Sequence, residues 1–358
     1  MHKTLICAAV VSMLASSAMA QSPAFYPKDY DKTIEAAKSE GKVVLYSPLS
    51  TTDIQPLITD FQTLYPGVTV EAVDLNTNVL YNRFISEVAA DSASADVVWS
   101  SASDLQAKLV DDGYAEAYKS PEEANLPKWA VWDKGGFGTT FEPFLSIFNK
   151  SHVTTPPESH AAIAKLISED QQFVGKVATY NIETSGVGFY GISRDSEQGD
   201  KFQGLAEALG KVKVRFYSSN GEMIESVASG ENLFAYNLPG FFAQRATKNP
   251  SIGVIYPKDF LTIGTRVAFL SAKAQHPNAG RLFLDYLLSQ RGQQVIANLG
   301  FFSLRDDVDG EAGAKALRAR FGDALVEPEV GPELLKYLDP AKRTEFLGSW
   351  KKNTQGTN

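Results

Sequence analysis

The chain has 358 residues and only one cysteine, Cys7. We expect Cys7 to leave with an amino-terminal signal, so the mature protein has no disulfide bond and no thiolate metal site. Its stability must then come from a hydrophobic core, and 44% of the residues are apolar. A chain of this length usually divides its core, which predicts two lobes.

Beyond the amino terminus, long apolar runs are also missing. No stretch approaches the ~18 uninterrupted apolar residues of a membrane span. The 34 Lys and Arg against 42 Asp and Glu give a formal charge of −8. Phosphate backbones select basic surfaces, so this acidic balance argues against a nucleic-acid partner.

Enzyme signatures are equally scarce. The sequence has no G-x-S-x-G elbow, H-E-x-x-H pair or P-loop. His152, His160 and His276 stand in polar or proline-bearing segments. We therefore name no catalytic residue, no cofactor and no metal ligand among these groups. A secreted hydrolase that uses two facing carboxylates is the alternative of another class, because such a pair is invisible in sequence.

The first twenty residues have the pattern of an export signal. Lys3 precedes an apolar run from Leu5 to Ala15, and small residues follow at Ala18-Met19-Ala20. Charge, short apolar run and cleavage site in this order are typical of a secretory signal peptide rather than a buried helix. We expect residues 1–20 to be removed and the mature protein to be periplasmic.

Strands and helices alternate along the chain. Apolar or alternating runs predict strands at 42–47, 68–73 and 95–100, and amphipathic periodicity predicts helices at 53–65 and 78–90. The pattern restarts after an extended segment at 137–149. Such repeats indicate an α/β fold with mainly parallel sheets covered by helices.

Hydroxyl side chains follow two of these strands. Ser47, Ser50 and Thr51 follow the first strand, and Ser100 and Ser101 follow the third. Ligands of open α/β sheets bind at the carboxyl ends of the strands, which makes these residues candidates for ligand contact. The alternative for each hydroxyl is that it caps the next helix.

The stretch "GVGFYG" at 186–191 has the G-x-G-x-x-G spacing of a dinucleotide-binding loop. The following strand ends at Phe216–Asn220 without the acidic residue that would bind the ribose, so we reject a dehydrogenase. A predicted helix instead begins at Thr184, Ser185 and Gly186. Its free backbone amides either bind an anion or are capped by the hydroxyls of Thr184 and Ser185.

Several segments resemble one family. They are "KVVLYSPLSTTD", "ADVVWSSASDLQAKLVDDG", "YNIETSGVG", "YSSNGEMIESVASGE" and the block from Pro277 to Arg305. They are similar to family 1 extracellular solute-binding proteins of ABC importers, in the group that binds ferric iron, phosphoglycerate, hexose phosphate or aminoethylphosphonate. The resemblance implies a type II two-lobe fold with a two-strand hinge, a small-molecule solute, an inner-membrane ABC permease as partner, and a monomer.

The resemblance also implies domain boundaries. Residues 1–20 form the signal peptide, 21–138 plus 266–315 the first lobe, and 139–265 the second lobe. The hinge crosses near 139–148 and 264–271. The segment 316–358 holds carboxy-terminal helices and a polar tail, and its lobe is left open.

The ligand class divides into two alternatives. Iron receptors of the family present adjacent tyrosines where this chain has Phe241-Phe242, and no Tyr-Tyr dipeptide occurs anywhere. Iron would then need the isolated Tyr46, Tyr217 and Tyr236. The favoured alternative is an organic phosphate, phosphonate or carboxylate anion.

For that anion, neutral donors of both lobes would surround the head group. They are Ser47, Ser50, Thr51, Ser100 and Ser101 on one side, and Thr184, Ser185, Gly186, Ser219 and Asn220 on the other. Tyr217, Tyr236 and Trp99 are the candidate apolar walls, with Trp99 placed in the core as the alternative. Arg266 is the candidate charge partner.

Overall fold

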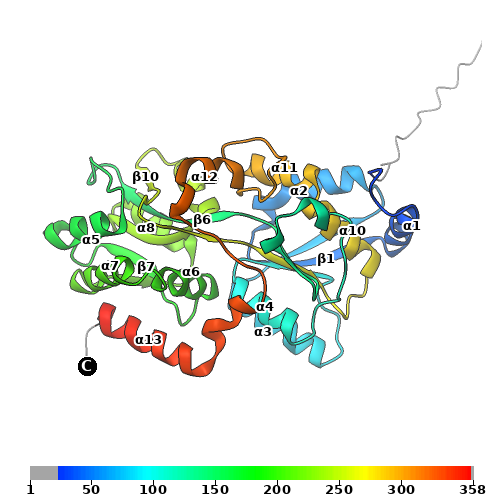
Figure 1. The fold of residues 1–358 in the computed structure, drawn as a ribbon, viewed down its shortest axis with the longest axis horizontal. Coiled ribbons are helices and arrows are strands. Elements are labelled where there is room, and N and C mark those ends of the chain that lie inside the picture. The colour runs from blue at the N-terminus through cyan, green and yellow to red at the C-terminus, as the bar shows by residue number, and fades with distance from the viewer. Residues whose placement is uncertain (1–22, 356–358) are drawn as a thin grey trace, which may run out of the picture.

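The computed structural model describes residues 23–355, so the predicted signal peptide and Cys7 lie outside the described residues. It contains two mixed sheets, one of six strands in the order β2-β1-β3-β12-β5-β4 and one of seven, β13-β11-β6-β9-β7-β8 with β10 paired to β6. The sheets lie along the long axis of the molecule, β1 to the right and β7 to the left (Figure 1). The predicted α/β fold is confirmed, but the sheets are mixed rather than mainly parallel, because β12, β5 and β4 in the first sheet and β6 in the second pair antiparallel with their neighbours.

The first sheet takes most of its strands from the amino-terminal part of the chain. Its strands are β1 (Lys42–Ser47), β2 (Thr69–Asp74), β3 (Val97–Ser100), β4 (Val131–Trp132), β5 (Gly136–Gly138) and β12 (Val267–Leu270). β1 runs parallel to β2 and β3, while β12 is antiparallel to β3. The three strands predicted at 42–47, 68–73 and 95–100 are therefore correct to within two residues.

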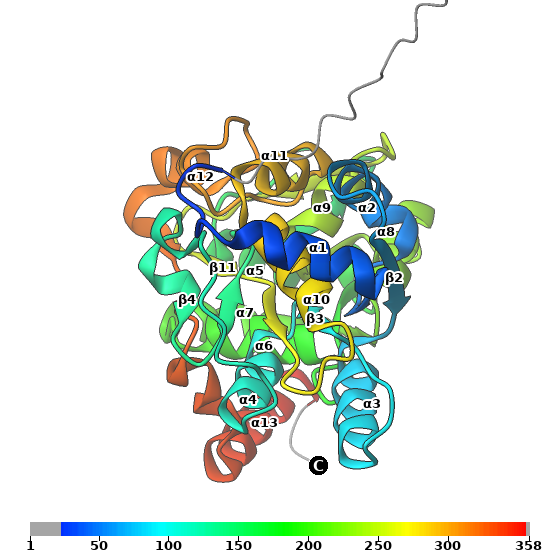
Figure 2. The same cartoon turned by 90° about the vertical axis from the view of Figure 1, so that its right-hand side faces the viewer.

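Six helices pack around this sheet. In Figure 2, α1 crosses in front of α10. They are α1 (Tyr30–Glu40), α2 (Thr51–Leu64), α3 (Thr77–Ala89), α4 (Ser103–Asp111), α10 (Pro277–Leu288) and α11 (Gln290–Leu299). α2 buries Ile54, Leu57, Ile58 and Phe61, the face that its spacing predicts. Within residues 23–355, no helix is long and apolar enough to cross a bilayer.

The second sheet holds β6 (Glu142–Asn149), β7 (Val177–Tyr180), β8 (Arg215–Tyr217), β9 (Phe234–Pro239), β10 (Ile252–Ile255), β11 (Leu261–Gly264) and β13 (Leu325–Val326). Around it lie α5 (His160–Glu169), α6 (Gly186–Ser196), α7 (Asp200–Lys211), α8 (Asn220–Ser229) and α9 (Gly240–Ala246). β7 is parallel to β8 and β9, and each of these strands leads into a helix, which places the amino ends of α6, α8 and α9 at one edge.

Two segments carry the chain between the sheets, 139–141 after β5 and 265–266 after β11. They are bonded to each other: Thr139 donates its N–H to the Arg266 carbonyl at 2.9 Å, and the Arg266 N–H donates to Thr140 Oγ1 at 2.8 Å. These crossings lie where the hinge is predicted. β13 then returns the carboxy-terminal part to β11. The lobe boundaries given above stay a prediction.

The glycines of "GVGFYG" are explained by packing of α6. A Cβ on Gly188 would lie 2.3 Å from Tyr180 Cβ, and one on Gly191 would lie 2.6 Å from Phe144 Cε1. The helix therefore approaches β7 and β6 too closely for any side chain at these positions. The spacing that resembles a nucleotide loop reflects helix-to-sheet contact.

The carboxy-terminal segment contacts both halves of the molecule. The 3-10 helix η5 (Pro332–Leu338) packs on α4, and α13 (Pro340–Gln355) packs on α7. Trp350 of α13 stacks on Phe202 with a centroid distance of 6.1 Å. In Figure 1 α13 runs along the lower side of α6 and α7.

One carboxylate is buried where these parts meet. Asp104 of α4 is 3% exposed, and among residues 23–355 no side chain donates a hydrogen bond to its carboxylate. α4 contacts α6 and η5, and the nearby Tyr190 of α6 is also buried. Burial raises the pKa of Asp104 to about 7, because the charged form loses its hydration.

We expect Asp104→Asn to change how stability depends on pH. The folded protein keeps a proton that the unfolded chain releases above pH ~4, so wild-type stability falls as pH rises from there through about 7. Asn carries no charge, so the free energy of unfolding of the variant should rise by ~2–4 kcal/mol relative to wild type as the pH goes from ~4 to ~8. Urea unfolding across this range measures the gain.

The matched control is Asp309→Asn, which removes an exposed carboxylate. Its unfolding midpoint should follow wild type at every pH. Parallel curves for Asp104→Asn and wild type would show that the buried carboxyl does not hold a proton in the folded state.

Candidate functional site

The candidate site lies at one edge of the first sheet. Ser47 ends β1, Ser100 ends β3, and Arg266 directly precedes the antiparallel β12, whose Val267 pairs with Ser100. Strands that end side by side place their following residues at the same edge. The structure thus brings together three residues that are far apart in the sequence.

The amino end of α6 meets this edge from the second sheet. Asn78 of α3 donates its side-chain N–H to the Thr184 carbonyl at 3.0 Å. A Cβ on Gly186 would lie 2.8 Å from Asn78 Oδ1 and 3.1 Å from both Ala102 Cβ and Leu105 Cδ1. The first residues of α3, α4 and α6 therefore converge, and their amides carry partial positive charge.

Several predicted hydroxyls act as helix caps. The Oγ atoms of Ser50, Ser185 and Ser219 accept the N–H groups of Asp53, Gly188 and Glu222, at 3.2, 3.3 and 3.2 Å. Ser219 belongs to a full capping box with Glu222. For these three Oγ atoms the capping interpretation holds, while ligand contact by the neighbouring amides stays a prediction.

The other predicted polar residues have varied surroundings. Ser100 Oγ accepts from the Ala102 N–H at 3.3 Å, and Ser101 is buried beside it. Thr184 Oγ1 lies 3.0 Å from Ser218 Oγ on an exposed surface, and Thr51 is exposed in the first turn of α2. The Oδ1 of Asn220 accepts from the Tyr180 hydroxyl.

The buried polar atoms at this edge without a hydrogen-bond partner among the described residues include Ser47 Oγ, Thr77 Oγ1 and Arg266 Nη1. Buried polar atoms in folded proteins are nearly always paired, so such atoms need an explanation. Sequence reasoning named Ser47 and Arg266 but missed Thr77. The sequence signal that could have identified Thr77 is its position at the start of α3, one residue after the Asn76 cap.

Arg266 is fully buried and paired. Its Nε donates to Glu142 Oε1 at 2.7 Å and its Nη2 reaches Glu142 Oε2 at 3.4 Å. The guanidinium lies 5.1 Å from the Phe301 ring centre and 6.0 Å from that of Phe242. Glu142 gives no sequence signal for this role, because it is one of 42 acidic residues.

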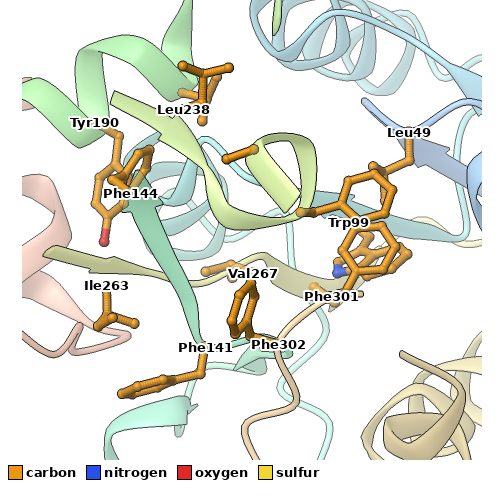
Figure 3. Packing of buried hydrophobic residues seen from close by; sticks show 14 of the residues in the cluster. Leu49, Trp99, Phe141, Phe144, Tyr190, Leu238, Ile263, Val267, Phe301 and Phe302 are labelled. Carbon is orange, nitrogen blue, oxygen red and sulfur yellow. The ribbon is translucent and has the colours of Figure 1, made fainter. Parts of the chain in front are cut away.

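Aromatic side chains surround this ion pair. Figure 3 shows Trp99 and Phe301 side by side, with Leu49 nearby. Trp99 is fully buried, and its Nε1 donates to Thr139 Oγ1 at 2.7 Å. Phe301 also stacks on Phe241 at 3.7 Å between ring centres. Trp99 therefore packs against the crossing segment, as the core alternative predicts.

The predicted tyrosines are held by separate groups. Tyr46 donates to Glu87, Tyr236 donates to Asp195, and Tyr217 accepts from Asn232. The pKa of Tyr236 is raised well above its usual value by burial and by the Asp195 charge, and burial also raises the pKa of Tyr46. Both shifts disfavour the phenolate that ferric iron would bind. Among residues 23–355, no cluster of three His, Cys, Asp or Glu side chains is arranged to hold a metal ion.

A cavity of about 430 Å³ opens next to the site, lined by the first turns of α2, by α9 and by the end of α11. Asp53 of α2 pairs with Arg245 of α9 across it. The cavity reaches Phe241, whose ring is stacked on Phe301, and Arg266 lies over Phe301. The aromatic pair thus separates the cavity from the guanidinium.

The sequence profile of the bacterial extracellular solute-binding proteins matches residues 48–294. The chain belongs to this family. A substrate-binding protein of an ABC transporter from Agrobacterium tumefaciens is 33% identical, with 87% of this chain and 94% of that chain covered and a TM-score of 0.83. This solute-binding protein is therefore the receptor component of an ABC importer, a class that delivers ligands to a permease and is generally not enzymatic.

More distant structures share the fold alone. AfuA from Actinobacillus pleuropneumoniae, with fructose-6-phosphate bound, is 14% identical, covers 89% of this chain and 100% of its own, and has a TM-score of 0.72. Iron-bound HitA from Pseudomonas aeruginosa is 17% identical, with 87% and 99% covered and a TM-score of 0.67. No curated protein sequence gives a significant match.

We expect Gly186→Leu to hold the two halves of this solute-binding protein apart. The new side chain would collide with Asn78, Ala102 and Leu105, which belong to α3 and α4 on the opposite side. The radius of gyration from small-angle X-ray scattering should rise, while far-UV circular dichroism stays that of wild type.

Gly204→Leu is the matched control, because no atom lies within 4 Å of a Cβ on this glycine of α7. Its scattering curve should match wild type. Identical curves for both variants would contradict the assignment of Gly186 to the contact between the halves.

Proposed function

We propose that this receptor binds a small organic anion, an organic phosphate, phosphonate or carboxylate, at the edge formed by Ser47, Thr77 and Arg266. The observation that carries the proposal is the fully buried guanidinium of Arg266, whose Nη1 has no partner, at the same sheet edge as the unpartnered Ser47 Oγ. A buried donor without an acceptor is costly, and an anionic oxygen removes that cost.

The surrounding backbone supports the same ligand class. The first turns of α3, α4 and α6 lie against each other at this edge, and helix amino ends attract negative charge without a lysine. This explains how a protein with a formal charge of −8 binds an anion. Phe242 and Phe301 beside Arg266 supply apolar walls for a carbon skeleton.

The iron alternative has less support. Tyr46, Tyr217 and Tyr236 each bond a different side chain, and the pKa shifts of two of them favour the neutral phenol. Where the family resemblance places the tyrosine pair of iron receptors, this chain has Phe241 and Phe242. Their rings offer no ligand atom for a metal.

The proposed mechanism is closure over the solute. The two crossing segments, 139–141 and 265–266, are bonded to each other and act as the pivot. A solute held by Ser47 and Thr77 on one side and the α6 amides on the other gains its full contacts only when the halves meet. It therefore shifts the equilibrium towards the closed form by its differential affinity.

We expect the protein purified gently from an exporting host to carry a small organic mass, visible by native mass spectrometry and lost on denaturation. Ser47→Ala should lower the retained fraction, corresponding to ~10-fold weaker binding for one lost hydrogen bond. Its thermal midpoint without solute should match wild type, because Ser47 Oγ has no protein partner to lose.

Ser103→Ala is the matched control, because its Oγ donates to the Thr265 carbonyl at 2.5 Å. That variant should lose thermal stability, in contrast to Ser47→Ala. A bound ferric ion in the wild-type spectrum would reject the organic anion, and full retention by Ser47→Ala would reject this site.

A further inference from the structure

We propose that the solute carries a single anionic head of the carboxylate type, as a monoanion or a zwitterion, and that dianionic phosphate and phosphonate heads are rejected. This inference rests on the proposed function and narrows its ligand class. It follows from the charge balance around Arg266.

The positive charge of Arg266 is already compensated inside the protein. Glu142 is 3% exposed, and its carboxylate accepts from both Nε and Nη2 of Arg266. Thr140 Oγ1 donates to the same carboxylate at 3.1 Å, which holds it in place. An incoming anion therefore meets a neutral ion pair, with a fixed negative charge on its far side.

The other charged side chains near this edge do not supply the extra positive charge that a dianion would need. Asp53 of α2 and Arg245 of α9 form a pair at the cavity. Asp104 in the first turn of α4 is a buried carboxyl group that interacts electrostatically with Arg343. The attraction for an anion comes from Arg266 together with the partial charges of the helix amino ends, which suits one negative charge.

The donors left at the site also fit a carboxylate. Glu142 takes the Nε–H and one Nη2–H of Arg266, which leaves the N–H groups of Nη1 as donors that have no partner among the described residues. Nη1 can serve one oxygen of a carboxylate, and the hydroxyl of Ser47 or Thr77 can serve the other. A head group with two charges would place its second charge close to the Glu142 carboxylate, which already pairs with Arg266.

The aromatic walls make this discrimination strong. Phe301 and Phe242 cover the guanidinium, which is 0% exposed. Water is therefore excluded from the pair, and charges interact more strongly where water cannot screen them. For the same reason, water does not screen the repulsion between Glu142 and a second negative charge on the ligand.

Titration calorimetry with matched probes tests the inference. Propanoate and β-alanine are each compared with the phosphonate of the same skeleton, ethylphosphonate and aminoethylphosphonate, together with longer matched pairs. At pH ~8 the carboxylate of a pair should bind at least ~10-fold more tightly. Phosphate groups lose their second proton near pH ~6. When the pH falls from ~8 to ~5, the phosphonate should therefore become a monoanion and bind more tightly, whereas the carboxylate keeps its single charge.

Variants of Glu142 separate its charge from its packing. Glu142→Gln keeps the shape and removes the charge, so it should raise phosphonate affinity relative to carboxylate by at least ~10-fold. Glu142→Asp keeps the charge and should retain the carboxylate preference, even if both affinities fall. The ratio within a pair is the readout, because a purely structural defect lowers both affinities together.

The outcomes separate the two proposals. Tighter binding of the phosphonate by wild type at pH ~8, or an unchanged ratio in Glu142→Gln, would overturn the charge argument and leave an anion receptor. Failure of every carboxylate and phosphonate to bind would overturn the anion site itself, and this inference with it.

Discussion

The ion pair between Arg266 and Glu142 is the interaction on which the arrangement of the two halves depends. Arg266 stands in one crossing segment, and Glu142 follows the other at the start of β6. The backbone of Arg266 bonds Thr139 and Thr140 of the partner crossing, so charge and backbone link the same two segments. Breaking such a buried pair by removing one partner typically costs ~3–5 kcal/mol, since it leaves an uncompensated charge.

This position gives the pair a double role in the proposed function. A solute that contacts Arg266 contacts the pivot itself, and the guanidinium is held there by Glu142 from the second sheet. Trp99 of β3 and Gln293 of α11 both donate hydrogen bonds to Thr139, so the first sheet and one of its helices also hold the crossing segment 139–141 in place. The proposed anion site and the proposed pivot therefore share the same contacts.

Much of the fold was predictable, because it depends on local periodicity. The strands at 42–47 and 95–100 and the helix at 53–65 show clear apolar patterns, and the structure has them within a few residues. The "GVGFYG" helix was also predicted, but the reason for its glycines was not. Gly188 is required by the closeness of Tyr180 at the end of the preceding strand, and Gly191 by that of Phe144, which comes from β6 much earlier in the chain.

Residues that are near one another in the chain carry the alternation of strands and helices, the family signature and the positions of polar residues after strands, so these features were predictable. Which of those polar residues have atoms without a partner depends on contacts between distant segments, so it required the folded structure. Ser50, Ser185 and Ser219 bond their own helices, whereas Ser47, Thr77 and Arg266 keep unpartnered atoms. The pairing of Arg266 with Glu142 likewise joins residues 124 positions apart, so the charge of the site depends on how the chain crosses between its sheets.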